Sequence, residues 1–323
     1  APLAMEKERL AHVVCECLHL PCPEPQLGDW KQMVDALKNP TSEVTIALVG
    51  KYIQLHDAYL SVMEALKHGG IANRTKVTIK WVDSEFLKPE ALDDTFAGVD
   101  GIIIPGGFGS RGTEGMILAA NYARENKIPF LGICLGMQMA MVAFARNVLG
   151  YADANSSELD PETTHPVVDL MPDQNGVENL GGTLRLGSYP CVLDKKSKAY
   201  SLYGTDMINE RHRHRFEINN DYRDDFTSHG MMISGQSPDG HIVEMIELPD
   251  HPFYVGIQAH PLFAGFVESA EEQGVLRRAK KLLMKRNHLS EPEAHRYLQK
   301  TSMDTGRTMA ESAHMVTMLI QED

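Results

Sequence analysis

One cysteine lies where a catalytic nucleophile would be expected. Cys134 falls within Gly132-Ile133-Cys134-Leu135-Gly136, between the apolar run PFLGI and a helical pattern. This spacing is typical of a nucleophile elbow, in which small flanking residues allow a tight turn that exposes the reactive atom. The following helix would direct its N-terminal N–H groups at the sulfur and favour the thiolate. A buried core cysteine is the alternative, but it does not account for the two glycines.

Backbone donors for a developing oxyanion are expected from two segments. The N–H of Leu135 follows the nucleophile, and Gly106 and Gly107 follow the apolar run DGIIIP, where no side chain shields the N–H groups. Gly107-x-Gly109-x-x-Gly112 has the spacing of a dinucleotide fingerprint, but it follows a later strand rather than the first one. No G-x-x-x-x-G-K-[ST] loop occurs, so the sequence predicts no P-loop for ATP.

Histidines and arginines supply a candidate base and candidate anion-binding groups. His260 ends the apolar run FYVGIQA, where a general base is well placed. In residues 210–217, ERHRHRFE, arginine alternates with histidine, so an extended segment would present cations along one side to a carboxylate ligand. A solvated charged face is the alternative. Two positions beyond His260, where an acid could orient the imidazole, the residue is Leu262.

The elements that must position these residues alternate along the chain. The short runs VTIALVG, VTIKWVD, DGIIIPGG and PFLGI predict strands, and helical patterns separate them. This alternation predicts a parallel sheet with helices on both faces and a site at the carboxyl ends of its strands. Three later runs would extend the sheet or add an antiparallel flank. They are GTLRLGSYPCVL, MMISGQSPDGHIVEMIEL and FYVGIQ.

Composition narrows the class of protein. The formal charge of −13 over 323 residues argues against a nucleic-acid binder as a whole, although a local basic patch remains open. No apolar run approaches the roughly 20 residues that cross a membrane, and the N-terminus lacks a signal-peptide pattern. Five cysteines, three of them within residues 15–22, favour a reducing cytoplasm over a disulfide framework. Their spacing is not that of a zinc knuckle, so we expect no metal site.

The order of motifs from about Val44 to His260 resembles the class I glutamine amidotransferases, and most closely the glutaminase domains of the CTP synthase family. The matching phrases are IALVGKY, PGGFGSRGTEGM, FLGICLGMQMA, RNVLGYADANSSEL, HPVVDLMP, GGTLRLG and ERHRHRFEIN. The resemblance implies a flavodoxin-like α/β sheet over residues 44–266, preceded by an interdomain linker in residues 1–43. A small all-α tail would follow in residues 267–323. The synthetase domain of that family is expected to be missing from this chain.

The resemblance also implies a role for each site residue. Cys134 would attack the side-chain amide of L-glutamine, giving a glutamyl thioester and ammonia, with His260 as base and acid. Gly107 and Leu135 would form the oxyanion hole, and Arg215 would bind the substrate's carboxylate. The full glutamine-binding set would be Gly107, Leu135, Gln138, Glu158 and Arg215.

Partners and cofactors follow from the same resemblance. In the complete enzymes, ammonia passes to a synthetase domain that uses ATP and Mg²⁺ to convert UTP into CTP, with GTP as an activator. Glutamine hydrolysis itself would need no cofactor. The resemblance implies a cytoplasmic homo-oligomer that does not bind membranes. The alternative is a non-catalytic amidotransferase-fold module tethered to an RNA-binding bundle; another amidotransferase or a cysteine peptidase on the same fold fits the Arg/His segment less well.

The stretch after His260 departs from the family pattern. The family has His-Pro-Glu, whereas this chain has His260-Pro261-Leu262. A later segment of the family resembles residues 261–266, PLFAGF, so we expect the glutamate to lie on a further loop between the two. A true replacement of the glutamate would cost several orders of magnitude in rate.

The tail after about Val267 predicts three helices. Ser290 with Glu293, and Thr308 with Glu311, are capping boxes at the second and third helix starts. The phrases AKKLLMKRN, LSEPEAHRYLQKTSMD and TGRTMAESA resemble ANTAR modules, which bind RNA hairpins. A shared core is expected from Leu282, Leu283, Leu298, Met309, Val316 and Leu319. A basic run would suit phosphates, with a solvated helical face as the alternative: Arg277, Arg278, Lys280, Lys281, Lys285 and Arg286.

Overall fold

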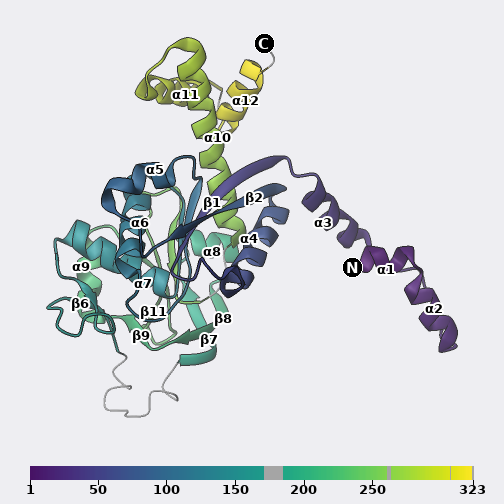
Figure 1. Ribbon diagram of the computed structural model, residues 1–323, viewed down its shortest axis with the longest axis horizontal. Coiled ribbons are helices and arrows are strands. Elements are labelled where there is room, and N and C mark those ends of the chain that lie inside the picture. The colour runs from purple at the N-terminus through teal and green to yellow at the C-terminus, as the bar shows by residue number, and fades with distance from the viewer. Residues whose placement is uncertain (171–184, 260–262, 306, 322–323) are drawn as a thin grey trace.

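A nine-stranded sheet forms the centre of the protein in the computed structural model, which describes residues 1–170, 185–259, 263–305 and 307–321. The strand order is β2-β1-β3-β4-β12-β11-β10-β7-β8 (Figure 1). These strands are β1 (Ser42–Gly50), β2 (Thr75–Asp83), β3 (Gly101–Ile104), β4 (Phe130–Ile133), β7 (Arg185–Leu193), β8 (Met207–His214), β10 (Met232–Gln236), β11 (Val243–Glu247) and β12 (Tyr254–Ile257). A second sheet joins β5 (Asn155–Ser156), β6 (Pro166–Leu170) and β9 (Phe216–Ile218).

The first half of the large sheet is parallel and the second half is antiparallel. Strands β2, β1, β3, β4 and β12 run parallel in this order, which is the flavodoxin-like order of a doubly wound sheet. From β12 onward, β11, β10, β7 and β8 pair antiparallel. The predicted α/β sheet is confirmed, and the later runs form an antiparallel flank.

Helices cover both faces of the sheet because the central strands present apolar side chains to both faces. In β1, Ile46 and Leu48 pack in one core cluster, whereas Ala47 and Val49 pack in the core cluster on the opposite face. The helices of this part are α4 (Leu60–Ala72), α5 (Leu92–Phe96), α6 (Thr113–Glu125), α7 (Leu135–Phe144), α8 (Lys198–Tyr203), α9 (Arg223–Ser228) and α10 (Phe263–Asn287). Short helical turns are η1 (His56–Tyr59), η2 (Pro89–Ala91), η3 (Ala145–Leu149) and η6 (Asn220–Tyr222).

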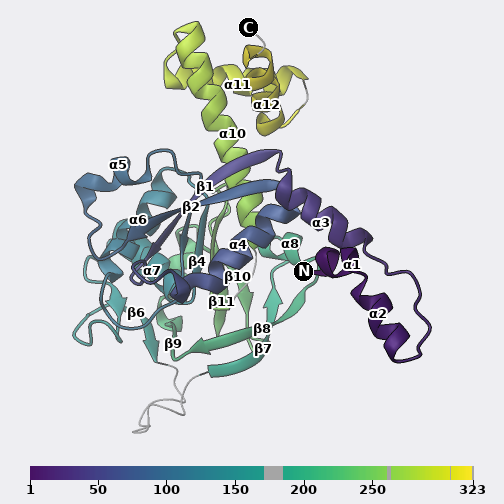
Figure 2. The same ribbon diagram turned by 45° about the vertical axis from the view of Figure 1, so that its right-hand side comes forward.

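The N-terminal segment is helical and makes little contact with the sheet. Helices α1 (Pro2–Lys7) and α2 (Leu10–Cys17) contain no buried residue, and Ala36 is the buried residue of α3 (Gly28–Lys38). The chain crosses the proline-rich PCPEP between α2 and α3 and extends away from the sheet in both views (Figures 1 and 2).

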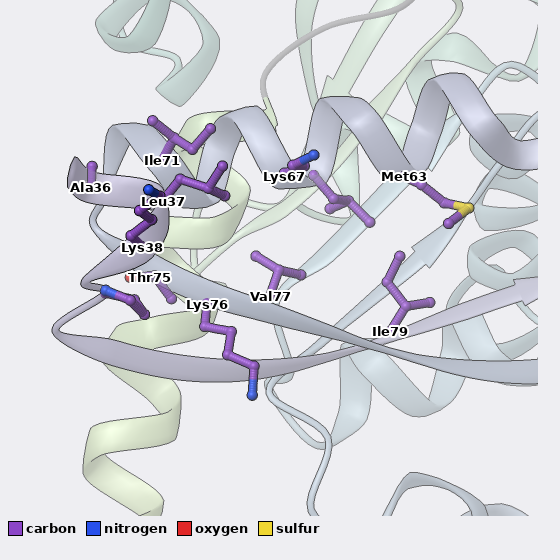
Figure 3. A pocket seen from close by; sticks show the side chains of 12 residues that line it. Ala36, Leu37, Lys38, Met63, Lys67, Ile71, Thr75, Lys76, Val77 and Ile79 are labelled. Atoms are coloured by element: carbon purple, nitrogen blue, oxygen red, sulfur yellow. The ribbon is translucent and has the colours of Figure 1, made fainter. Parts of the chain in front are cut away.

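A small groove lies where α3 meets α4 and the edge strand β2. Figure 3 shows apolar side chains from all three elements lining it, with lysines around them. Its lining includes Leu37, Met63, Ile71, Val77 and Ile79, and it contains neither a carboxylate nor a cysteine. This groove is therefore a packing feature of the sheet edge and not a second reactive site.

The tail forms the three predicted helices, but the first is longer than expected. α10 begins at Phe263 and continues into a bundle with α11 (Glu291–Thr305) and α12 (Met309–Gln321), so the predicted boundary at 266/267 falls inside one helix (Figure 1). The domain boundaries remain predictions.

Both capping boxes of the tail form. Ser290 Oγ donates to Glu293 Oε2 at 2.6 Å, and the N–H of Thr308 donates to Glu311 Oε2 at 2.8 Å. Leu283, Leu298, Met309 and Val316 join the bundle core. Of the other two residues predicted for this core, Leu282 lies half-buried outside the cluster, and the side chain of Leu319 lies outside the described residues.

Within the described residues, no helix is both long and apolar enough to cross a membrane. Those residues also contain no group of three His, Cys, Asp or Glu side chains placed to hold a metal ion.

Candidate active site

The elbow around Cys134 requires its two glycines for close packing. Cys134 caps α7 with φ 52° and ψ −106°, a conformation that L-residues rarely adopt. A Cβ on Gly136 would lie 2.0 Å from the carbonyl oxygen of Ile104, and one on Gly132 would lie 2.7 Å from the carbonyl oxygen of Gly136. The N–H of Cys134 donates to Ile257 O at 2.7 Å. The turn is thus held against strands on both sides, and strain of this kind is typical of functional positions.

The Cys134 thiol is protonated at neutral pH, contrary to the expectation that the helix N-terminus favours the thiolate. Burial is the main cause that raises the pKa of Cys134, to about 12; the N–H of Leu135 opposes this shift, and the carboxylates of Glu217 and Glu158 contribute to it. Desolvation of a charged sulfur therefore outweighs the single backbone donor. A reaction at this sulfur needs a base to remove its proton.

The glycine loop after β3 lies directly beside the elbow, as predicted. A Cβ on Gly106 would lie 3.5 Å from the Cβ of Cys134 and 4.0 Å from its Sγ. A Cβ on Gly107 would lie 3.5 Å from Cδ2 of Leu135. The two segments expected to supply oxyanion donors are thus brought together, although Gly107 and Leu135 are 28 positions apart in sequence.

A buried lysine that the sequence analysis did not identify holds this glycine loop. Lys51, at the end of β1, is 3% exposed, and its Nζ donates to Phe108 O at 3.1 Å and Gly109 O at 2.6 Å. Burial lowers the pKa of Lys51, and Arg111 lowers it further, while Glu158 opposes them. The phrase VGKY at a strand end was the available signal, but only the fold shows that the ammonium group ties down the loop.

The predicted substrate-binding residues gather around the same point. Gln138 is 4% exposed and its Nε2 donates to Phe216 O at 2.9 Å, which joins α7 to β9. Burial raises the pKa of Glu158, whereas Arg215, Lys51 and the N–H of Gly109 lower it. Glu158 therefore lies within electrostatic reach of two cations and of the glycine loop.

Arg215 has a donor without a hydrogen-bond partner in the described part of the chain. Among the described residues, its Nε is buried without a hydrogen-bond partner, and its Cζ lies 5.9 Å from the ring centroid of Phe216. A buried guanidinium donor without a partner costs free energy that a carboxylate ligand would recover. Arg215 thus has the properties of a carboxylate receptor.

The alternating Arg/His segment does not line the site with cations along its whole length. β8 ends at His214, and within it Arg211 and Arg213 are exposed while His212 and His214 are buried. Because successive side chains of a strand point to opposite faces, both arginines point to solvent. Only Arg215, beyond the strand end, lies near the other predicted residues.

Behind the site lies a network of buried charges that the sequence analysis missed. Arg185 Nη1 lies 2.5 Å from Glu244 Oε1, His214 Nε2 bonds closely to Glu217, and Gln258 Nε2 donates to Glu217 Oε2 at 3.3 Å. Arginine and glutamate are normally surface residues, so their types gave no signal. The acid within the apolar run HIVEMIEL was a usable sign, since an inward-facing Glu in a strand needs a partner.

The expected base lies outside the described residues. His260, Pro261 and Leu262 follow β12, whose register places Ile257 beside Ile133, the residue before Cys134. The printed sequence runs continuously through this stretch, so the expected further loop with a glutamate is not part of this chain. Leu262 therefore stands where the family pattern has its acid.

Comparisons with known proteins agree with this geometry. The sequence model of Glutamine amidotransferase class-I matches residues 54–270, and that of the ANTAR domain matches residues 266–316. The CTP synthase of Clostridium beijerinckii is 53% identical over 283 residues, which are 84% of this chain and 53% of that protein. The CTP synthase of Carboxydothermus hydrogenoformans is 56% identical over 262 residues, 81% of this chain and 49% of that protein. The chain spans about half the length of these relatives.

A solved structure gives the same result in three dimensions. The glutaminase domain of Trypanosoma brucei CTPS with bound acivicin superposes with a TM-score of 0.66 at 36% identity, covering 70% of this chain and 93% of that one. The family match extends over more than half of the chain and includes the elbow, the glycine loop and Arg215. The chain therefore belongs to the class I glutamine amidotransferases.

Proposed function

We propose that this chain hydrolyses L-glutamine through a thioester on Cys134 and is the ammonia-releasing part of a CTP synthase. The observation that carries the proposal is the position of Cys134 between two sources of backbone N–H groups, within reach of Glu158. Arg215, whose charge lowers the pKa of Glu158, offers a buried donor that has no partner among the described residues. An amide-cleaving nucleophile near both an acid and a cation suits a substrate that carries both an amide and an amino-acid group.

The chemical sequence follows from the proton that Cys134 holds. His260 removes this proton, and the sulfur attacks the amide carbon of glutamine, while the N–H groups of Gly107 and Leu135 stabilise the oxyanion. The nitrogen leaves as ammonia after taking a proton from the imidazolium. Water activated by the same imidazole then cleaves the thioester, which releases glutamate and restores the thiol.

Three side chains orient the substrate in this proposal. Arg215 binds the α-carboxylate, and Glu158, together with Gln138, holds the amino-acid end on the opposite side. Burial raises the pKa of Glu158, and Arg215 and Lys51 oppose this shift.

The use of the ammonia is proposed from the relatives, which carry the name CTP synthase. UTP would be the acceptor, with ATP, Mg²⁺ and the activator GTP bound by a synthetase domain rather than by the residues described above. A homo-oligomer in the cytoplasm would be the working form. RNA binding by the tail remains a separate prediction, and filter binding of a hairpin RNA at two salt concentrations would test it.

Leu262 is the observation that favours the alternative, a non-catalytic amidotransferase module. The relatives do not favour this alternative, because the chain matches named enzymes over four fifths of its length. Loss of the acid predicts a slower enzyme rather than a different function, since the nucleophile and oxyanion donors persist.

Ammonia release tests the proposed function. Purified protein with L-glutamine should release ammonia and glutamate in equal amounts, Cys134→Ala should abolish the release, and Cys17→Ala, an exposed thiol on α2, should not change it. Leu262→Glu should raise kcat if the missing acid limits the rate. Ammonia release that persists in Cys134→Ala would refute the proposed nucleophile, and no release by any variant would favour the binding module.

A further inference from the structure

A second cavity lies at the opposite end of the sheet from Cys134. It has a volume of about 790 Å³ and lies against the segments that lead into β3, β4 and β12, including Val99, Pro129 and Pro252. The amino ends of parallel strands meet there, whereas Cys134 follows the carboxyl end of β4. The other wall is the outer half of α10 with the starts of α11 and α12. The cavity is thus bounded jointly by the amidotransferase sheet and the helical tail.

Part of the wall on the sheet side is apolar and carries two stacked aromatic rings. Phe96 and Tyr122 stack with ring centroids 5.1 Å apart, and Ile128 and Pro129 continue this wall. On the tail side, Leu276, Met284 and Met309 face the same space. A cavity of this size with apolar and aromatic walls matches the usual properties of a small-molecule site.

The charged residues of the cavity are mostly cations, although the whole chain carries a formal charge of −13. Arg277 is paired with Asp100 at 2.7 Å, and Lys280 with Glu291 at 3.3 Å. The remaining lining cations are Lys127 on the sheet side and Lys281 on α10, and no acid among the described residues forms an ion pair with either.

Lys127 and Lys281 therefore leave the cavity with two positive charges that its own acids do not balance. Lys127 Nζ donates to Asp250 O at 3.1 Å, which holds it at the rim without neutralising its charge. A positive cavity on an acidic protein attracts anions and repels cations.

We propose that this cavity binds a small aromatic anion, in particular an aryl phosphate. Its ring lies on the apolar wall beside Tyr122, and its phosphate lies between Lys127 and Lys281. Because one lysine comes from the sheet side and the other from the tail, the ligand fastens the helical bundle to the amidotransferase sheet. Glu291 and His295 at the start of α11 border the same space, so a bound ligand should further stabilise that helix start.

Binding is tested with a matched pair of fluorescent probes on the full chain. 8-Anilinonaphthalene-1-sulfonate carries the required negative charge, and N-phenyl-1-naphthylamine is its uncharged counterpart. The anion should bind at one saturable site, and 1-naphthyl phosphate should displace it, whereas inorganic phosphate at the same concentration should not. Displacement by inorganic phosphate alone would refute the role of the aromatic wall, and equal binding of the neutral probe would refute the role of the lysines.

Three variants locate the site. Lys127→Gln and Lys281→Gln should each weaken binding of the anion by roughly three- to fivefold, the upper range for one exposed ion pair, and both together by about tenfold or more. Lys285→Gln removes an exposed lysine one turn further along α10, outside the cavity, and should leave binding unchanged. All three positions are exposed, so folding should be preserved, which circular dichroism checks. Equal effects from Lys285→Gln and Lys281→Gln would overturn the proposal.

A separate readout tests the fastening of the tail. Hydrogen exchange at the start of α11 should slow when 1-naphthyl phosphate is added to the native chain, and this slowing should be lost in Lys281→Gln. Unchanged exchange at saturating ligand would refute the link between the tail and the sheet. Glutaminase activity has no part in these measurements, so their outcome is independent of the proposed function.

Discussion

Replacing Arg215 with alanine tests whether this residue receives the substrate's carboxylate. Arg215 Nε is buried with no partner among the described residues, and Glu158 lies within electrostatic reach. The substitution removes the group that would pair with the carboxylate of glutamine. It also leaves Glu158 without a cation that lowers its pKa, so this pKa should rise further and weaken its attraction for the substrate's ammonium group.

The expected loss of affinity is that of one hydrogen bond between the guanidinium and the carboxylate. A hydrogen bond to a charged group contributes about 1.5–3 kcal/mol, and about 1.4 kcal/mol corresponds to a tenfold change in affinity. Arg215→Ala should therefore raise the Kd of L-glutamine by roughly 10- to 150-fold. Arg213→Ala is a matched control, because Arg213 is two residues earlier but points to solvent from β8.

Calorimetric titration in a Cys134→Ala background measures binding without turnover. Wild-type Arg215 and Arg213→Ala should bind L-glutamine alike, while Arg215→Ala should bind weakly. 4-Aminobutanamide, which has the amide and the amine but no carboxylate, should lose much less affinity than L-glutamine on Arg215→Ala, because only the indirect effect through Glu158 remains. Equal loss for both ligands, or no difference between Arg215→Ala and Arg213→Ala, would refute the assignment.

Three further predictions concern the elbow and the stability of the fold. Gly136→Ala should destabilise the protein by about 1–3 kcal/mol or more, because its Cβ would meet a backbone oxygen at 2.0 Å, whereas Gly28→Ala has open space and should not lower Tm in a thermal melt. Glu217→Gln should lower the pKa of Cys134 by removing a nearby negative charge, so iodoacetamide should alkylate this thiol faster at pH 8; a slower rate would contradict the sign. Burial lowers the pKa of His251 from 6.5 to about 4, so the imidazole takes up a proton more readily in the unfolded chain than in the folded one. The free energy of unfolding should therefore fall by about 3 kcal/mol as pH drops through this range. Urea titrations at pH 7 and 4.5 should show a smaller drop in His251→Gln, and an identical drop would rule out this contribution.

The elbow and the glycine loop were predictable because each has a local signature. The glycines around Cys134 mark a turn in which a helix packs against a neighbouring strand, and the Cβ distances at Gly132 and Gly136 confirm that no larger residue fits. The glycine loop could be linked to this turn because the carboxyl ends of parallel strands meet at one edge of a sheet. The capping boxes of the tail were equally local, since Ser290 and Thr308 each bond to a residue three positions further on.

The tertiary structure alone decided the electrostatics. The sequence predicts a thiolate from the helix that follows Cys134, but burial and the carboxylates of Glu217 and Glu158 reverse the direction. Glu217 comes from a small sheet more than 80 residues away, so no sequence spacing reports its distance from the sulfur. Desolvation depends on everything packed around a group, and that is a property of the whole fold.

The sequence by itself determined the fold class and predicted the nucleophile and the segments that would supply backbone donors, because strand periodicity and glycine spacing are local properties of the chain. Only the tertiary structure decided which cation of the ERHRHRFE run reaches the site, since β8 ends at His214 and sends Arg211 and Arg213 to solvent. It alone also showed that Lys51 clamps the glycine loop and that the tail shares a positively charged cavity with the sheet. These features depend on contacts between distant segments, and their distances are set only when the sheet assembles.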